Sequence, residues 1–363
     1  MSVAAETPRP GFAGPTAHQV RRFKLRGRKT WRLAVIVAAA VASGVLAVLF
    51  ARLCDLAGAQ HAAWAARFPL GVLILPPLLL PLMTWLTLKI APEAGGSGIP
   101  QVIAASEEAR RGVADPRVSL KTAAFKMVVA AVLLLAGMSI GREGPTVQIV
   151  AALVFAFTAR LRGGPHPRTL LIAGGAAGVA AAFNTPIAGV VFAVEELAKG
   201  FERRAATVII LVVVAAGAAA YAMAGNYSYF GEIRGSRALA SAWMSAPILG
   251  VVGGLAGGLF SLALASVLGP DRRPVGRFRA ARPVVFALIC GVATSIIAFA
   301  SHGLSYGTGY AEASSLLAGH PVRALTLGVS KWAAISGPTR PGSRVISIRI
   351  TALVRGAWTT PDR

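Results

Sequence analysis

Long apolar runs, separated by short basic or broken segments, dominate the hydrophobic pattern of this chain. Several runs are long enough to cross a hydrocarbon core about 30 Å thick, which takes roughly 20 helical residues. We predict apolar helices at residues 33–53, 68–90, 123–140, 145–161, 169–183, 186–197, 205–224, 245–268 and 281–300, and a weak one at 322–335. The pattern predicts an all-α polytopic membrane protein.

Two of these predicted helices, at 169–183 and 186–197, are too short to cross a membrane as straight helices. Short segments interrupted by glycine or proline are typical of discontinuous helices that meet near the bilayer midplane, as in transporters built from inverted repeats. We therefore expect tilted and broken helices rather than a bundle of straight spans.

Composition and charge agree with a membrane location, since 55% of the 363 residues are hydrophobic and 14% are charged. The formal net charge of +23 would also suit a nucleic-acid-binding protein, but no reading motif accompanies the charge, so that class is disfavoured. The basic residues instead gather between apolar runs, as in cytoplasmic loops, and anionic lipid headgroups are their expected partner. The basic clusters lie at 21–32, 110–117, 160–168, 203–204 and 272–282.

The basic clusters also predict an orientation with the N-terminus in the cytoplasm. The first helix then runs outward, 68–90 returns inward, and 123–140 runs outward again, which places the segment after residue 140 toward the outer side. Residues 1–30, with prolines ahead of a basic stretch, are predicted to be a disordered cytoplasmic tail. They lack the layout of a cleaved signal peptide.

Three breaks in the apolar pattern share one form, in which small or polar residues precede a proline and an apolar run. They are Gly-Ser-Gly-Ile-Pro at 96–100, Gly-Arg-Glu-Gly-Pro at 141–145 and Phe-Asn-Thr-Pro at 183–186. Proline suits the first turn of a helix, so each break should begin a helix whose free N–H groups and positive dipole end can face an anion. One such break alone would read as a packing kink, whereas three together favour an anion path.

The polar groups of these breaks are candidates for ion chemistry. Ser97 offers a hydroxyl donor without a full charge, which suits a halide that must bind weakly enough to leave. Glu143 lies between apolar runs, and an intramembrane carboxylate usually marks an ion or proton pathway. Two interpretations stay open for Glu195 and Glu196, which are either a solvated helix end at the cytoplasmic surface or an inner proton acceptor.

The motifs resemble those of the ClC family of chloride channels and proton/chloride antiporters. The resemblance rests on GSGIP at 96–100, on GREGP at 141–145 with the following Thr-Val-Gln-Ile, and on AAAFNTPIAGVVFAVEE at 180–196, and it covers residues 31–332. It implies a ClC-type fold of tilted, broken helices in inverted repeats and a homodimer with one pore per subunit. It further implies transport of chloride and protons across a bacterial inner membrane, without enzyme chemistry, cofactor or metal.

The resemblance also implies roles for single residues. Ser97 resembles the serine that coordinates the central chloride, and Glu143 resembles the gating glutamate. Glu196 resembles the inner proton-transfer glutamate of the antiporters, and the presence of both acids favours proton-coupled exchange over simple conduction. The expected anion-binding residues are Ser97, Gly98, Ile99, Gly141, Arg142 and Gly144.

The second half of the chain departs from the family pattern. The Gly-x-Phe-x-Pro break and the later ion-coordinating tyrosine of the family are missing, and arginines at 344, 349 and 355 keep the final segment from spanning a membrane. We therefore expect a first repeat at 31–225, a partial second repeat at 226–335 and an atypical basic tail at 336–363. The corresponding hypothesis is a C-terminally truncated family member, with a frameshift as one cause. The alternative to chloride transport is a truncated membrane fragment that does not transport.

Overall fold

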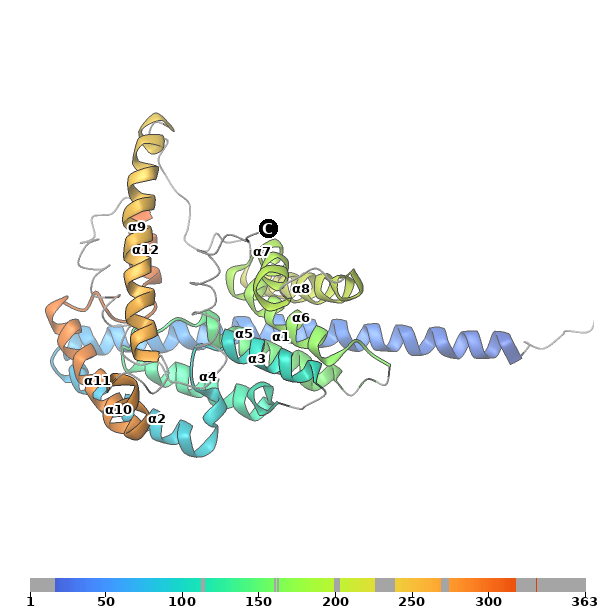
Figure 1. Cartoon of the computed structure of the whole chain (residues 1–363), viewed down its shortest axis with the longest axis horizontal. Coiled ribbons are helices and arrows are strands. Elements are labelled where there is room, and N and C mark those ends of the chain that lie inside the picture. Colours follow the sequence, from blue (N-terminus) through green and yellow to red (C-terminus); the bar gives the residue numbers. More distant parts are fainter. Residues whose placement is uncertain are drawn as a thin grey trace, which may run out of the picture.

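The computed structural model describes residues 17–111, 115–159, 161, 163–198, 203–225, 239–268, 274–317 and 331. Over these residues the chain is helical and contains no strand (Figure 1), which confirms the predicted all-α class. The helices are α1 (Ala17–Arg67), α2 (Leu75–Ile90), α3 (Ile99–Arg110), α4 (Leu120–Leu135), α5 (Glu143–Thr158), α6 (Pro167–Phe183), α7 (Pro186–Phe192), α8 (Arg203–Ala224), α9 (Leu239–Leu268), α10 (Pro274–Ala281), α11 (Pro283–Ala300) and α12 (Tyr310–Leu317). Short 3-10 turns lie at η1 (Gly71–Ile74), η2 (Pro92–Ala94) and η3 (Pro116–Val118), and a π-helical turn lies at η4 (Ala193–Ala198).

Helix α1 is much longer than the predicted span at 33–53. It has 51 residues and projects beyond the other helices in Figure 1. The prediction of a disordered tail was wrong for residues 17–30, which are helical. The physical reason is that arginine, lysine, leucine and glutamine favour helix, and the last proline of the tail precedes the helix start.

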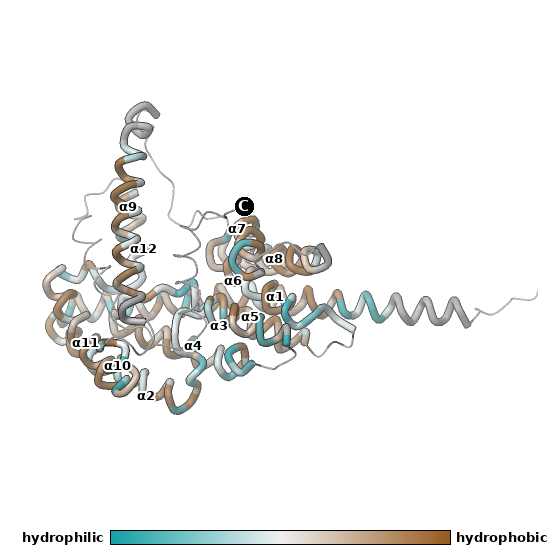
Figure 2. Tube along the Cα trace, viewed as in Figure 1, coloured by the Kyte–Doolittle hydropathy of each residue, from teal (hydrophilic) through white to brown (hydrophobic). Residues whose placement is uncertain are grey.

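Among the described residues, five helical segments are long and apolar enough to cross a membrane, judged by length and composition. The hydropathy colouring of Figure 2 shows the apolar character of α9 and α11 in particular. Helices α5 and α6 are apolar but have only 16 and 17 residues, as expected for broken helices. The candidate spans are Gly27–Arg67, Gly71–Ile90, Ala205–Ala224, Ser245–Leu264 and Pro283–Ala300.

Helix α6 lies at the centre of the main core. Every residue from 170 to 181 is buried, as expected of a helix that is apolar on all faces. Its glycines allow close approach of α5. A Cβ added to Gly174 would lie 2.8 Å from the Cα of Ala151, and one added to Gly178 would lie 2.8 Å from the Cα of Val147. The interpretation of these glycines as helix contacts is confirmed.

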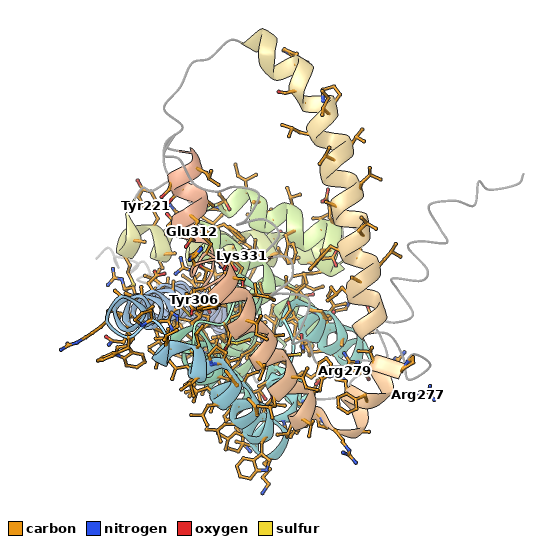
Figure 3. The ribbon with its side chains drawn as sticks, turned by 90° about the vertical axis from the view of Figure 1, so that its left-hand side faces the viewer. Tyr221, Arg277, Arg279, Tyr306, Glu312 and Lys331 are labelled. Atoms are coloured by element: carbon orange, nitrogen blue, oxygen red, sulfur yellow. The ribbon has the colours of Figure 1, made fainter. Side chains whose placement is uncertain are left out.

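Helix α9 behaves differently and, in the gold colour of Figure 1, stands apart from most of the other helices in Figure 3. No residue in its apolar window is buried. An added Cβ would meet nothing within 4 Å at any of its glycines, Gly250, Gly253, Gly254, Gly257 and Gly258. The same interpretation of glycines as helix contacts stays a prediction for α9, because no described helix packs against these glycines.

Two groups of buried residues make up the core. The main group joins α1 and α3 to α8, all within the predicted first repeat, and a smaller group joins α2, the end of α4, and α11. The repeat boundaries stay predictions. The expected tail at 336–363 lies outside the described residues, and so does the weak helix at 322–335 except for Lys331.

Candidate functional site

Two of the predicted breaks meet, backbone against backbone, at a contact that we call the junction. A Cβ added to Gly144 would lie 2.6 Å from the carbonyl oxygen of Ser97 and 2.7 Å from its Oγ. A Cβ added to Gly98 would overlap the carbonyl group of Gly144. Gly98 also has a φ of +119°, which only glycine adopts readily. Residues that lie more than forty positions apart in the chain thus meet at one place.

Two helices begin at the junction. Helix α3 begins at Ile99, with Pro100 in its first turn, and α5 begins at Glu143. The first N–H groups of a helix have no acceptor within the helix and carry partial positive charge. Together with the exposed Ser97 hydroxyl, these groups can bind an anion without a full positive charge.

Glu143 is the first residue of α5 and is half-buried. Its carboxylate folds back along its own break, since a Cβ added to Gly141 would lie 2.6 Å from Oε2. A carboxylate at a helix N-terminus is stabilised by the same partial charges that would hold an anion. The carboxylate of Glu143 therefore lies at the positive end of α5.

The guanidinium of Arg142 is held against α1. Its Nη1 donates to Oδ1 of Asp55 at 2.5 Å and to the carbonyl oxygen of Ala51 at 3.1 Å. This ion pair ties the start of α5 to α1. Sequence analysis included Arg142 among the anion-binding residues, and the structure leaves its backbone, rather than its charged group, as the part suited to that role.

A buried polar network holds the loop that carries Ser97. Nζ of Lys126, on α4, donates to the carbonyl oxygen of Gly96 at 2.8 Å and to Oε1 of Gln148 at 2.6 Å. Nε2 of Gln148 donates in turn to the carbonyl oxygens of Arg117 at 2.6 Å and of Glu93 at 3.2 Å. The side chains of Lys126 and Gln148 are 4% and 0% exposed, so the network is desolvated and its hydrogen bonds are strong.

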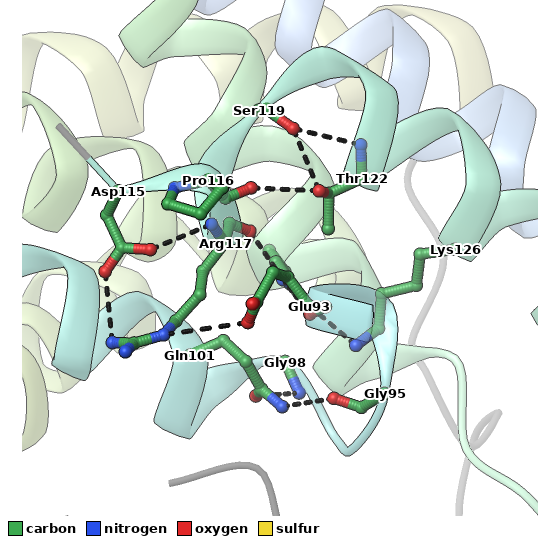
Figure 4. A network of polar contacts seen from close by, with 11 residues as sticks. Glu93, Gly95, Gly98, Gln101, Asp115, Pro116, Arg117, Ser119, Thr122 and Lys126 are labelled. Atoms are coloured by element: carbon green, nitrogen blue, oxygen red, sulfur yellow. Dashed lines mark hydrogen bonds and ion pairs between the residues drawn. The ribbon is translucent and has the colours of Figure 1, made fainter. Parts of the chain in front are cut away.

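Gln101 holds the other side of the same loop (Figure 4). Its Oε1 accepts from the backbone N–H of Gly98 at 2.8 Å, and its Nε2 donates to the carbonyl oxygen of Gly95 at 2.5 Å. This is the side-chain half of a capping box, in which the third residue of a helix reaches back to the cap. Gln101 therefore fixes the turn at which α3 begins.

Sequence analysis missed this network. The available signal was Lys126 itself, a charged residue inside an apolar run, because such residues are rare and usually functional. Its partners could not be read from the chain, since they come from three different elements.

The third break is tied to the end of α8. Phe183 packs against the main core, and Nδ2 of Asn184 donates to the carbonyl oxygen of Gly225 at 3.4 Å. Asn184 has a φ of +55° and ends α6, and α7 begins at Pro186, as predicted. The structure thus joins the first two breaks to each other and places the third at the contact between α6 and α8.

Glu195 and Glu196 lie in the π-helical turn η4 that follows α7, and both are exposed. On the same turn, Leu197 is buried, and its Cδ1 would lie 2.9 Å from a Cβ added to Gly175 of α6. π-Helical turns are rare in proteins overall, and those that occur often lie at functional sites. Exposure of the two carboxyl groups agrees with either interpretation left open by the sequence.

Comparisons with known proteins add independent findings. Residues 71–340 match the family described as "Voltage gated chloride channel". The chain is 35% identical to the H(+)/Cl(-) exchange transporter ClcA of Salmonella arizonae and to that of Citrobacter koseri, in each case over 54% of this chain and 44% of the relative. The chain therefore matches less than half the length of these relatives.

Solved structures show the same fold. A CLC-type fluoride/proton antiporter superposes with a TM-score of 0.69 at 22% identity, over 86% of this chain and 77% of the antiporter chain. A slow cyanobacterial Cl-/H+ antiporter superposes with a TM-score of 0.59 at 22% identity, over 90% of this chain and 81% of the other. The expected ClC-type helical fold is confirmed.

The network around Lys126 predicts the effect of removing its amino group. Lys126→Met keeps most of the apolar stem but leaves the buried acceptors on Gly96 and Gln148 without their donor. An unpaired buried acceptor costs about 1–3 kcal/mol, so we expect a lower midpoint in thermal unfolding of the detergent-purified protein, followed by tryptophan fluorescence. Lys121→Met is the matched control, because Lys121 lies on the same helix and is exposed. Equal midpoints for the two variants would contradict the role of the network.

Proposed function

This chain belongs to the voltage gated chloride channel family and is an integral membrane protein, and on that premise we propose that it transports chloride in exchange for protons. The observation that carries the proposal is the junction, where the Ser97 hydroxyl lies against Gly144 at the point where α3 and α5 begin. The names of the bacterial relatives, which are exchange transporters, support exchange rather than simple conduction.

Chloride binds at the junction through partial charges. Ser97 supplies its Oγ–H, Ile99 supplies an N–H from the first turn of α3, and the backbone from Gly141 to Gly144 supplies the start of α5. Such donors hold a monovalent anion without trapping it, because conduction requires that each site release the ion again. Gly98 contributes by having no side chain, which lets the two donor segments approach the same ion.

Glu143 acts as the gate. In its charged form the carboxylate occupies the positive end of α5 and excludes chloride, because both would use the same donors. Protonation removes the negative charge and with it the attraction to the helix end, so the side chain leaves and chloride enters. Access of chloride to its site is thereby linked to the protonation of Glu143.

Glu196 serves as the inner proton acceptor in this proposal. Its position on an exposed turn after α7 gives protons access from solvent, and it lies on a different element from the gate.

The proposed location is a bacterial inner membrane with the N-terminus in the cytoplasm. The N-terminal end of α1 carries exposed Arg28 and Lys29, which suit anionic headgroups at the cytoplasmic leaflet. This orientation sends α1 and α4 outward and places Glu143 toward the outer side of the membrane.

Glu143→Ala should remove the dependence of chloride flux on pH, because alanine cannot occupy the anion site in competition with chloride. The measurement is chloride efflux from liposomes that contain the purified protein, recorded from about pH 3.5 to about 7.5, a range that brackets the ordinary pKa of a carboxyl group. Glu108→Ala is the control, since Glu108 lies in an exposed ion pair with Arg111 at 3.7 Å.

Retained pH dependence in Glu143→Ala would defeat the gate. Absence of flux from well-incorporated wild-type protein would defeat transport by this chain alone. That result would favour the second candidate, a membrane fragment that does not transport by itself, for which the 44% coverage of the relatives is the motivating observation.

Glu196→Ala should uncouple the two ions. We expect chloride efflux to continue while the opposing proton movement, recorded with an external pH electrode, is lost, because the inner proton acceptor is gone. Glu195→Ala, one residue away on the same exposed turn, should retain coupling. Coupled proton movement that persists in Glu196→Ala would contradict the assignment, and wild-type flux without proton movement would indicate a channel.

We propose a homodimer that forms through α7 and α8. Both helices carry exposed apolar residues, with Ile187 82% exposed at the start of α7 and Val214 51% exposed on α8. In addition, α7 is too short to span the membrane alone. Light scattering of the detergent-purified protein should give a dimer mass, and the double variant Ile187→Trp/Val214→Trp should shift it toward the monomer. Val128→Trp, on exposed α4 surface, is the control. A monomeric wild-type protein would contradict the dimer.

A further inference from the structure

The turn that leads into the gate is held by two side chains that the proposed transport mechanism does not use. We call residues 136–140, between the end of α4 and the break at 141–145, the gate turn. His61 of α1 and Tyr306 of the loop after α11 both contact it. Any displacement of this turn displaces the start of α5, because Met138, Ser139 and Ile140 alone separate Gly137 from Gly141.

The end of α4 leaves one carbonyl group for His61. The backbone N–H of Gly137 donates to the carbonyl oxygen of Leu134 at 2.9 Å, and that of Met138 donates to Leu133 at 3.0 Å. Gly137 has a φ of +79°. This is a Schellman motif, which satisfies two of the last carbonyls of the helix and leaves that of Leu135 free for another donor.

His61 supplies that donor. Its Nδ1 lies 3.0 Å from the carbonyl oxygen of Leu135. A carbonyl oxygen can only accept, so Nδ1 carries the proton. The side chain is 2% exposed, and a donor at the C-terminus of a helix also interacts favourably with the helix dipole. The contact therefore joins α1 to the end of α4 across 74 positions of the chain.

Gly137 lies under the rings of both His61 and Tyr306. A Cβ added to it would lie 2.5 Å from Nε2 of His61 and 2.9 Å from Cδ1 of Tyr306. The two rings meet edge to face, with centroids 4.4 Å apart and planes at 69°, which is a favourable aromatic geometry. Burial raises the pKa of Tyr306 above its ordinary value, so its phenol stays neutral and the ring acts by packing.

The loop that carries Tyr306 is itself anchored. Nζ of Lys331 donates to the carbonyl oxygens of Ser305 at 3.0 Å, of Tyr306 at 2.5 Å and of Gly307 at 2.7 Å. Figure 3 shows Tyr306 and Lys331 in the same region of the molecule. These three charge-assisted hydrogen bonds fix the backbone of the loop and thereby the position of the Tyr306 ring.

Helix α1 therefore holds the gate turn from both sides. His61 holds Leu135 before the turn, and Asp55 holds Arg142 after it through the 2.5 Å ion pair. The two α1 residues are about 9 Å apart along the helix axis. Because the gate turn is fixed at both ends to one rigid helix, its backbone keeps a defined position. Only the side chains that it carries remain able to move.

We propose that His61 and Tyr306 are positioning residues for the gate, which fix where α5 begins relative to the junction. This inference rests on the proposed function of Glu143. When the turn is loosened, the N-terminal end of α5 stabilises the charged carboxylate of Glu143 less strongly. The gate then opens when a smaller fraction of Glu143 is protonated.

Hydrogen–deuterium exchange of the purified wild-type protein and its variants tests the positioning without reference to transport. In His61→Ala the backbone amides of residues 136–144 should exchange on the order of tenfold faster, the effect of losing one buried hydrogen bond. His61→Asn, whose side-chain N–H can replace Nδ1–H, should stay close to wild type. Gln60→Ala, on the adjacent exposed position, is the control.

The pair Tyr306→Phe and Tyr306→Ala repeats the test should His61→Ala fail to fold. Phenylalanine keeps the ring contact and should preserve slow exchange, whereas alanine should accelerate it. Unchanged exchange in both His61→Ala and Tyr306→Ala would overturn the positioning role.

Chloride efflux from liposomes then tests the link to the gate. We expect His61→Ala to shift the pH of half-maximal flux upward and to have no further effect on the pH response in a Glu143→Ala background. Faster exchange with an unshifted pH response would overturn the link. Absence of wild-type flux would overturn the proposed function instead, and the exchange measurement alone would then decide whether His61 holds the turn.

Discussion

The contact between Gly98 and Gly144 is the constraint on which the site depends. No side chain separates the two backbones there, because a Cβ on either residue would overlap or crowd the other segment. The starts of α3 and α5 are therefore brought to one place, with the Ser97 hydroxyl beside them. Partial positive charges from two helices act together only at such short range, since the field of a helix end falls off within its last turn.

Two basic side chains lie beside this junction, but oxygen atoms engage them. Nζ of Lys126 donates to Gly96 and Gln148, and the guanidinium of Arg142 pairs with Asp55. Both side chains thus serve to hold backbone in place. In the proposed mechanism the anion therefore meets only weak donors, which suits an ion that must bind and leave, and the charged carboxylate of Glu143 competes with it for the same donors.

Sequence alone predicted the features that a short stretch of chain encodes. The glycines and prolines of the breaks at 96–100 and 141–145 predict helix starts. Helix α5 begins at Glu143, two residues before the predicted start at residue 145. The long-range contacts could not be predicted, because Lys126 and Gln148 are 22 positions apart and His61 and Leu135 are 74 apart. The helical start of α1 could not be predicted from its polar, basic pattern, which is typical of a tail although its residues favour helix. The open surface of α9 was missed because glycines predict close packing only where a partner helix is present.

The central claim is that the junction binds the transported anion. Bromide can replace chloride and be located by its anomalous scattering, so crystals of the protein grown with bromide give the most direct measurement. The account predicts an anomalous peak at hydrogen-bonding distance from Oγ of Ser97, between the starts of α3 and α5, and loss of that peak in Ser97→Ala. Bromide bound elsewhere in the protein, with no peak at the junction, would contradict it.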